Sequence, residues 1–314
     1  MDLIYKMSYI KKSKKIFKTS LFLSIGKGIG FIVPIVVANL LKTSSTSDSF
    51  FLAYAIIMFF SGVFAVAIQG NIVPFYLKLL KKTDIEDKKG FLGYFFIFYI
   101  AAAIILVFTA VLIMAILVFS GILKQSLLVE LLIGVSPFFI FMISSSYMIG
   151  LLNAIDKYEF GAISPGIRAV INLVVIFLLF DKIGVWSIIL GYIIGELFKN
   201  IYLLFIIFKH KIFYFSWKTQ KNYSNYIFLF LKTMIFQNIS LMIVGLKPVF
   251  DRFIGTFLAV GSVSLIEYST KITDIPNTLI SGSILVIFLT DWSKKIHHHD
   301  NPDLKKDFKK YTAF

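Results

Sequence analysis

Long apolar stretches alternate with short polar links along almost the whole chain. Each stretch has at least the roughly 20 residues that a helix needs to cross a bilayer core of about 30 Å. We predict eight spans, near residues 21–41, 50–76, 92–120, 127–152, 161–180, 184–208, 227–258 and 262–290. The pattern indicates an all-α protein, a polytopic transmembrane helical bundle of about eight helices.

The composition fits this class. The 314 residues are 58% hydrophobic, and the mean hydropathy of +0.85 lies outside the range of soluble domains. The chain has no cysteine, which excludes disulfides, thiol catalysis and cysteine-ligated zinc. A net charge of +15 would suggest nucleic acid in a soluble protein. Here the lysines lie in the links between spans, so we expect no nucleic-acid partner.

The distribution of lysine predicts the topology, because cytoplasmic links carry an excess of Lys and Arg. Lysine-rich segments are the N-terminus, residues 78–89, residues 209–221 and the tail from Lys294, whereas links 42–49, 120–126 and 181–183 are poor in lysine. We therefore expect both termini on the cytoplasmic side of the membrane. Basic links also suit anionic membrane lipids as partners. The basic start resembles that of a signal peptide, but the first apolar stretch is too long for one.

The seventh predicted span is longer than a membrane is thick. At 1.5 Å per residue, 227–258 exceeds the bilayer core, and we expect Gly245 and Pro248 to kink it. Alternatively, one helix ends at Leu246 and the remainder forms two short spans. That alternative sends the C-terminal lysines outside, so eight spans fit the charge bias better.

Weak internal similarities suggest a repeat. Phe17–Phe22 resembles Leu231–Phe236, and Ser47–Tyr54 resembles Ser262–Tyr268. These similarities reflect either chance between apolar helices or a six-helix unit that recurs in the same orientation. The predicted organisation is a basic cytoplasmic N-terminus (1–20), a six-helix lobe (21–208), a cytoplasmic linker (209–226), the first two helices of a second lobe (227–290) and a cytoplasmic tail (291–314).

Ionisable residues inside spans cost about 2.5–3.5 kcal/mol on insertion scales, so each needs a reason. Lys27 lies between Gly26 and Gly28, where it either extends back to the cytoplasmic surface or faces a cavity. We interpret Arg168 as structural, with its side chain reaching the cytoplasmic surface. Glu196 and Lys199 are three residues apart and are expected to pair on one helix face.

The densest charged group lies on the eighth span. Glu267, Lys271 and Asp274 have spacings of four and three, which puts them on one stripe of a helix. Such a stripe cannot face lipid, so it either lines a cavity or neutralises itself in the packing. We expect partners for it on the seventh span, at Lys247, Asp251 or Arg252.

Other polar residues predict little chemistry. Asp48 opens the second span and is expected to cap that helix. The run His297–His299 has the residue type of a metal site, but it lies in a polar tail without further ligands, so no metal site is expected. No nucleotide loop, acid–base pair or catalytic triad is found, so we expect neither an enzyme nor a cofactor.

Three groups of residues resemble the MurJ/MviN family of lipid II flippases. They are Ser47–Tyr54 with Val73-Pro74; Gly150–Ala154 with Pro165 and Asn172; and Asp251–Phe253 with Gly261–Ser264 and Tyr268–Pro276. The last is the most specific, and the resemblance runs from about Leu21 to Ser293. This family belongs to the multidrug/oligosaccharidyl-lipid/polysaccharide (MOP) exporter superfamily, whose members are built from two six-helix lobes around a central cavity.

The resemblance implies movement of a polyprenyl-diphosphate-linked glycan precursor, lipid II or related, by alternating access across the bacterial cytoplasmic (inner) membrane. It also implies a role for Lys27 and Lys271, which occupy positions where the family places cavity arginines that bind the diphosphate. Our candidate substrate-binding residues are Lys27, Lys271, Arg252 and Asp48, and the candidate cavity or coupling residues are Glu267, Asp274, Glu196 and Lys199.

The chain departs from the family pattern in two ways. Val33 and Pro34 stand where the family has an Arg-Asp pair, and Phe60, Ser61 and Gly62 stand where it has basic residues. A surface-glycan precursor is then as plausible a substrate as lipid II. The chain also contains only the start of a second lobe. We expect either a truncated product or a chain that is completed by itself or by a second polypeptide.

Two alternatives remain open at this stage. Another polysaccharide or multidrug exporter of the superfamily would share the fold, although drug exporters are expected to carry buried acidic residues in the first three helices. A non-transporting partner subunit in cell-wall assembly would have Glu267, Lys271 and Asp274 paired internally, without a cavity.

Overall fold

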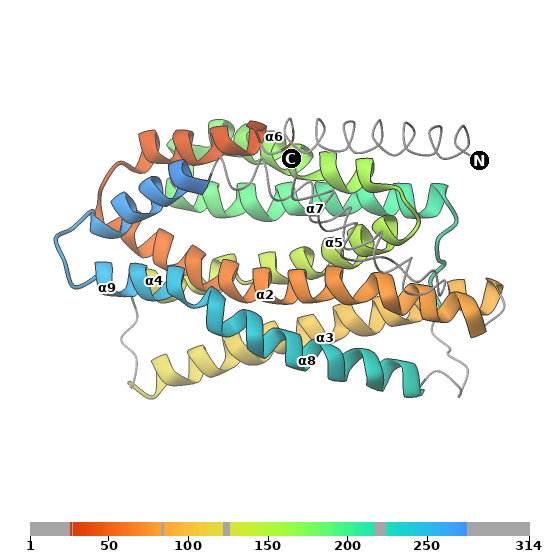
Figure 1. The fold of residues 1–314 in the computed structure, drawn as a ribbon. Coiled ribbons are helices and arrows are strands. Elements are labelled where there is room, and N and C mark those ends of the chain that lie inside the picture. Colours follow the sequence, from red (N-terminus) through yellow and green to blue (C-terminus); the bar gives the residue numbers. More distant parts are fainter. Residues whose placement is uncertain (1–25, 27, 83–84, 122–125, 217–223, 275–314) are drawn as a thin grey trace, which may run out of the picture.

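A computed structural model describes residues 26, 28–82, 85–121, 126–216 and 224–274 (Figure 1). Within these residues all regular structure is helical, which confirms the predicted fold class. The helices are Gly28–Leu41, α2 (Ser45–Lys82), α3 (Ile85–Phe119), α4 (Leu127–Val135), α5 (Pro137–Ala154), α6 (Tyr158–Ile183), α7 (Val185–Lys209), α8 (Ser224–Gly245), α9 (Lys247–Gly255) and a helix over residues 262–274.

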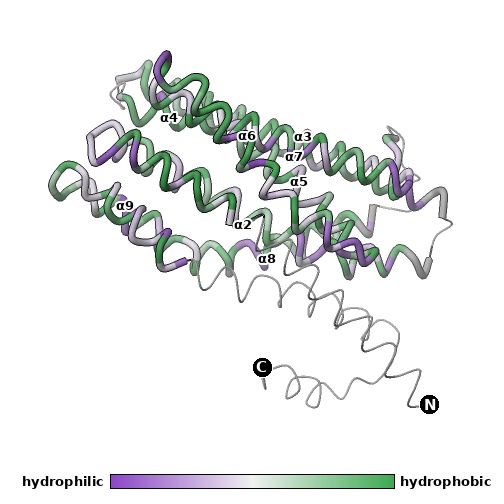
Figure 2. Tube along the Cα trace, turned by 90° about the horizontal axis from the view of Figure 1, so that it is seen from above, coloured by the Kyte–Doolittle hydropathy of each residue, from purple (hydrophilic) through white to green (hydrophobic). Residues whose placement is uncertain are grey.

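Six described segments are long and apolar enough to cross a membrane. They are Ser45–Leu79, Lys88–Phe119, Leu127–Ala154, Tyr158–Ile183, Val185–Lys209 and Ile227–Gly255. Each coincides with one predicted span. The two other predicted spans, the first and the eighth, lie partly outside the described residues. The protein is therefore a multi-pass membrane protein, and its helices are hydrophobic along most of their length (Figure 2).

Two of these spans are interrupted at a proline. We predicted a kink near Gly245 and Pro248, and the structure has a break there, because α8 ends at Gly245 and α9 begins at Lys247. A second break was not predicted: α4 ends at Val135, and α5 begins at Pro137. Proline is tolerated in the first turn of a helix, where its missing N–H would have no partner. A proline that opens a new helix is hard to distinguish by sequence from one that bends a continuous helix.

Close packing of α6 against α7 forms one wall of the bundle (Figure 1). Gly191 and Gly195 of α7 face α6: a Cβ atom on Gly195 would lie 2.6 Å from the carbonyl oxygen of Arg168. Glycines four residues apart let two membrane helices approach closely. At the N-terminal side, Gly26 contacts α6 similarly, and a Cβ there would lie 3.3 Å from the nitrogen of Gly166. Glycine therefore determines how closely α6 packs against its neighbours.

The helices differ in how much of their surface other helices cover. In the most hydrophobic 18 residues of each span, 56% are buried for Ser45–Leu79 on α2, but only 6% for Lys88–Phe119 on α3. The central helix α2 contacts α4, α5, α8 and α9. A polar contact adds to its packing on α8, since Asn71 Nδ2 donates to Gln237 Oε1 at 2.6 Å. The exposed side of α3 is apolar, as expected for a surface in contact with lipid tails.

The predicted division at 209–226 into two lobes and a linker stays a prediction. Within that range, residues 212–216 have no regular secondary structure, Ile212 and Phe213 are buried in the core, and Phe213 packs against Phe96 of α3 and Phe208 of α7. The two similar segments Ser47–Tyr54 and Ser262–Tyr268 contact each other at one end of the bundle. That contact suits a repeat, although the repeat itself also stays a prediction.

Candidate functional site

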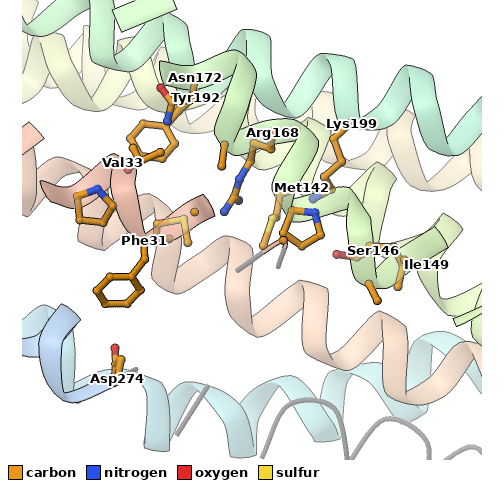
Figure 3. Close-up of a pocket in the computed structure, with 18 of the residues that line it drawn as sticks. Phe31, Val33, Met142, Ser146, Ile149, Arg168, Asn172, Tyr192, Lys199 and Asp274 are labelled. Atoms are coloured by element: carbon orange, nitrogen blue, oxygen red, sulfur yellow. The ribbon is translucent and has the colours of Figure 1, made fainter. Parts of the chain in front are cut away.

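A cavity of about 490 Å³ lies between the helices (Figure 3). Its wall consists of Gly26 and the helix Gly28–Leu41, of α2, α5, α6 and α7, and of the helix over residues 262–274. The cavity therefore lies between most of the N-terminal helices and the last described helix, which belongs to the predicted second lobe.

Helix periodicity decides which side chains line the cavity. From α5 these are Met142, Ser146, Ile149 and Asn153. Their spacings of four, three and four residues keep them on one face of a helix. This face is more polar than lipid would tolerate, which is consistent with its position on a cavity rather than on the outer surface.

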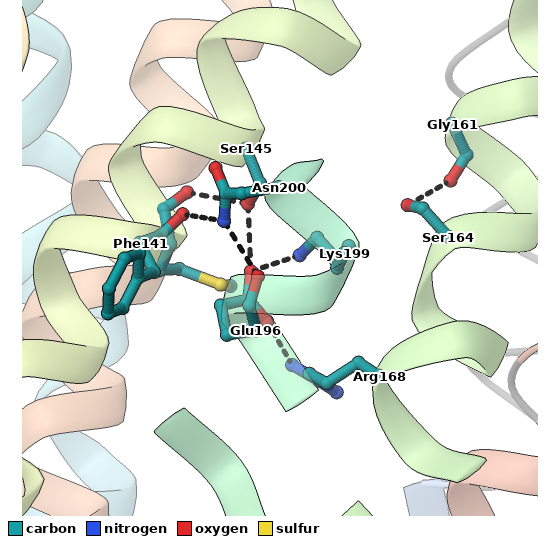
Figure 4. A network of polar contacts seen from close by, with 9 residues as sticks. Phe141, Ser145, Gly161, Ser164, Arg168, Glu196, Lys199 and Asn200 are labelled. Carbon is teal, nitrogen blue, oxygen red and sulfur yellow. Dashed lines mark hydrogen bonds and ion pairs between the residues drawn. The ribbon is translucent and has the colours of Figure 1, made fainter. Parts of the chain in front are cut away.

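Arg168, Glu196 and Lys199 form the first charged cluster, which we call the N-terminal triad (Figure 4). Lys199 Nζ donates to Glu196 Oε1, and the guanidinium of Arg168 lies 3.5 Å from Glu196 Oε2. Ser145 of α5 adds a third donor, 2.8 Å from Oε1. Glu196 is completely buried, whereas Arg168 and Lys199 both line the cavity. The carboxylate thus lies behind two cations and holds them at the cavity wall.

The surroundings of the N-terminal triad are tightly bonded. Asn200, one turn along α7, donates from Nδ2 to the carbonyl oxygens of Phe141 (2.9 Å) and Glu196 (2.8 Å). These bonds connect α7 to α5 next to the ion pairs. A buried charge is tolerated only where partners and hydrogen bonds offset its desolvation, and here three helices supply them.

The second charged cluster, which we call the C-terminal triad, consists of Arg252 on α9 with Glu267 and Lys271. Arg252 donates from Nε (2.8 Å) and from Nη2 to Glu267 Oε2, and Lys271 Nζ lies 3.1 Å from Glu267 Oε1. Arg252 and Glu267 are buried, but the side chain of Lys271 is 32% exposed and lines the cavity. Asp274, one turn further, also lines the cavity and forms no ion pair with a described residue.

Asp48 binds a different helix from the one that we predicted. Ser44 and Ser47 cap α2, with the amide of Ser44 2.8 Å from Ser47 Oγ and the amide of Ser47 3.2 Å from Ser44 Oγ. The carboxylate of Asp48 instead accepts bonds from the amides of Gly261 (2.6 Å) and Ser264 (2.9 Å). These amides belong to the N-terminus of the helix over 262–274, where a carboxylate is favoured. Asp48 thus joins α2 to the predicted second lobe at one end of the bundle.

The structure brings together most of the predicted site residues. The predicted pair Glu196–Lys199 is confirmed, as is a partner for the eighth span at Arg252. Lys27 lies outside the described residues, although its neighbour Gly26 lines the cavity. Arg252 and Asp48 do not line it. Whether any of these residues binds substrate stays a prediction.

The predicted position of the Arg168 side chain was wrong, whereas its structural role stays a prediction. Its guanidinium does not extend to the cytoplasmic surface but pairs with Glu196 at the cavity wall. The reason is a buried carboxylate on the neighbouring helix, which no spacing within α6 could reveal. The sequence analysis named Asn172 only for the family resemblance and not as a site residue. Asn172 is 1% exposed, lines the cavity and has an Oδ1 atom without a hydrogen-bond partner among the described residues. The sequence signal for its position was the Gly191-x-x-x-Gly195 motif of α7, whose Gly191 packs against Asn172.

Comparison with known proteins assigns the family. A family model described as "Lipid II flippase MurJ" matches residues 37–314. The chain belongs to the MurJ lipid II flippase family. This MurJ-family chain is similar to the probable lipid II flippase MurJ of Aquifex aeolicus, with 28% identity over 281 residues that cover 86% of this chain and 55% of the relative. It thus spans about half the length of the curated relative that it matches.

Solved structures support the same fold for this MurJ-family chain. A lipid II flippase MurJ in an inward closed conformation has a TM-score of 0.64 at 22% identity, covering 85% of this chain and 55% of that one. The Vibrio cholerae MATE transporter VcmN has a TM-score of 0.69 at 10% identity (93% and 67%). A MOP superfamily transporter from Pyrococcus furiosus has a TM-score of 0.66 at 13% identity (90% and 66%). The chain therefore has the fold of this superfamily.

The described part of this MurJ-family chain holds no group of three or more His, Cys, Asp or Glu residues that could bind a metal. The run His297–His299 lies outside the described residues.

Proposed function

We propose that this chain takes part in moving a polyprenyl-diphosphate-linked glycan precursor across the cytoplasmic membrane by alternating access. One observation carries the proposal: three cations, Arg168, Lys199 and Lys271, line one cavity. Two lie on the N-terminal helices, and the third lies on the last described helix. An anion bound between them would contact both predicted lobes.

The charge of the two triads suits a diphosphate. Each triad combines two cations with one carboxylate, and neither Glu196 nor Glu267 lines the cavity. Each triad therefore presents a net positive charge to the cavity. In a low-dielectric site a cation attracts phosphate more strongly than it does in water, and its hydrogen bonds to a charged oxygen are strong. Lysine gives a point charge without the two-pronged geometry of arginine.

Alternating access requires two lobes that move against each other around the bound substrate. Because the chain spans about half the length of its curated relative, we propose that the transporting unit includes further helices, from the same polypeptide, a second copy or another protein. Asp48 and Ser264 join the two predicted lobes at one end of the bundle. Separation of the lobes at that end would open the cavity there.

Lysine-rich helix ends support a cytoplasmic position for the opposite end of the bundle. Asp48 lies in the first turn of α2 and Lys78 near its last turn, while Lys88 lies near the start of α3 and Lys209 ends α7. We propose that the lysine-rich end faces the anionic inner leaflet, with both termini of the chain on the same side. A precursor made in the cytoplasm would then enter from this side.

A binding measurement tests the proposal without needing a complete transporter. The purified chain in lipid nanodiscs is titrated with an undecaprenyl-diphosphate-linked disaccharide, and Lys271→Ala is compared with the wild type. A hydrogen bond to a charged group contributes about 1.5–3 kcal/mol, so we expect about a tenfold or greater loss of affinity. Lys232→Ala is the matched control, because Lys232 is exposed on α8 and does not line the cavity.

Expression in a bacterium depleted of its lipid II flippase then tests transport. Growth that depends on Lys271 would support a lipid II flippase. Binding without growth would instead favour another glycan lipid or a missing second part. If the wild type does not bind the lipid, or if Lys271→Ala and Lys232→Ala bind it equally well, the proposal is wrong and a non-transporting membrane subunit becomes the better description.

A further inference from the structure

An uncharged polar patch lies on the cavity wall beside the N-terminal triad. Ser145 donates to Glu196, and the next residue of α5, Ser146, lines the cavity. Two turns further along the same face, Asn153 lines it near the end of α5, and Gln69 of α2 contributes from the adjacent helix. We call Gln69, Ser146 and Asn153 the uncharged patch.

Close packing of α2 on α5 brings Gln69 to this face. The two helices meet at Gly150, where an added Cβ would lie 2.0 Å from Ile72 Cγ2 and 3.6 Å from Gln69 Cα. A larger residue at position 150 would push α2 away. Since Asn153 is one turn beyond Gly150, Gln69 and Asn153 border the same part of the cavity.

Among the described residues, the uncharged patch has unused hydrogen-bonding capacity. Ser146 is 1% exposed and Asn153 is 5% exposed, yet no side-chain hydrogen bond of Gln69, Ser146 or Asn153 is found in the part of the chain that the structure describes. Figure 3 shows the hydroxyl group of Ser146 pointing toward the open centre of the cavity. Polar groups at membrane depth without protein partners are expensive unless water or a ligand binds them.

We infer that the uncharged patch binds the sugar that is directly linked to the diphosphate. This inference rests on the proposed function. It assigns a binding site to the sugar, while the cations bind the diphosphate. A carboxamide both donates and accepts hydrogen bonds, and a hydroxyl group does the same, so these side chains match the hydroxyl and acetamido groups of a sugar. They add no charge, which favours a neutral sugar next to the diphosphate.

The order of the groups along α5 fits the order of groups in such a lipid. The triad cations lie beside Ser145 and Ser146, and Asn153 is seven residues further, or about 10 Å along the helix axis. A diphosphate on Arg168 and Lys199 would place its first sugar over Ser146. The ring would extend toward Asn153 and Gln69, at the end of α5 that we propose to face the cytoplasm.

Two lipids that differ only in the sugar test the inference. Undecaprenyl diphosphate carrying one N-acetylhexosamine is compared with the methyl ester of undecaprenyl diphosphate, which has the same charge and no sugar. Two or more hydrogen bonds at about 0.5–1.5 kcal/mol each predict that the wild type binds the sugar lipid about tenfold more tightly. In the double variant Gln69→Ala/Asn153→Ala this preference is lost, while the affinity for the methyl ester is unchanged.

Asn39→Ala serves as the matched control, because Asn39 is an exposed carboxamide that does not line the cavity. If the double variant has a lower thermal stability than the wild type, Gln69→Met repeats the test with the side-chain length retained. Equal affinities of the wild type for both lipids, or a preference that survives in the variants, would mean that only water occupies the patch. Failure of the proposed function differs from this outcome, because the wild type would then not bind the methyl ester either.

Discussion

The two triads have the same composition but different settings. In each, one buried carboxylate pairs with an arginine and a lysine. Glu196 has a third donor in Ser145, and Lys199 is only 6% exposed at its side chain. In the C-terminal triad the lysine, Lys271, is 32% exposed. The lysine of the N-terminal triad is thus held between helices at the cavity wall, with Arg168 the more exposed cation at 23%, whereas the lysine of the C-terminal triad is open to the cavity.

This difference suggests a division of labour. A buried carboxylate with three donors mainly keeps its helices in place, because any movement would leave a buried charge without its partner. A lysine that is partly exposed can leave its carboxylate and contact a ligand at lower cost. We therefore expect changes in the N-terminal triad to affect stability most, and changes around Lys271 to affect ligand binding most.

The largest effect should come from Glu196→Gln. It leaves Lys199 and Arg168 with no carboxylate in a buried site, and removal of one partner of a buried ion pair costs about 3–5 kcal/mol. We expect a large fall in the unfolding temperature of the chain in detergent, measured by tryptophan fluorescence. The double variant Glu196→Gln/Lys199→Met should recover part of the loss, since the lysine charge is removed as well. A fall of less than a degree or two would mean that water reaches the triad.

Glu267→Gln should cost less, about 1–3 kcal/mol, because Lys271 is partly exposed and can turn toward water after losing its partner. The buried Arg252 accounts for most of the loss, although its bond to the Pro248 carbonyl oxygen (2.7 Å) remains. The same unfolding measurement compares the two isosteric changes side by side. Equal destabilisation by Glu196→Gln and Glu267→Gln would contradict the difference between the triads.

These two carboxylates also show what sequence could and could not predict. The spans were predictable because hydropathy over some 20 residues is a local property. Pairing within one helix, as between Glu196 and Lys199, was predictable because spacing places both residues on one face. The bond from Arg168 to Glu196 joins two helices, and its existence depends on how closely Gly195 allows α7 to approach α6.

The same distinction explains the misplaced cap of Asp48. Its position in the first turn of α2 suggested that it caps that helix, and local rules gave no reason to look further. In the structure two serines cap α2, so the carboxylate is available to bind amides more than 200 residues away in sequence. The two prolines that open helices show the same limit of local rules. The span with Pro248 was too long for the membrane, which signalled an interruption, whereas the span with Pro137 gave no such signal.

Asp48→Ala tests whether the C-terminal triad owes its position to this contact. Loss of a helix-capping carboxylate costs about 0.5–2 kcal/mol, less than either change above. Because the chain has no cysteine, a single Val263→Cys substitution reports on opening: Val263 is completely buried. We expect slow labelling by a thiol reagent with Asp48 present and faster labelling in the Asp48→Ala background. Labelling of Cys that is equally slow in both would show that other contacts hold this end closed.

The smallest expected effect is that of Asp274→Asn on ligand affinity. Asp274 is exposed and lines the cavity near the C-terminal triad, and none of the described residues gives the N-terminal triad a second acidic neighbour on the cavity wall. Its negative charge should oppose a bound diphosphate, but the charge is screened by water, and such exposed interactions amount to less than about 1 kcal/mol. We expect the variant to bind the undecaprenyl-diphosphate disaccharide a few-fold more tightly at low salt and equally at high salt, because salt screens exposed charges. Weaker binding by the variant would show that Asp274 instead accepts hydrogen bonds from the ligand, and the open side of the cavity would then recognise the sugar as well as the diphosphate.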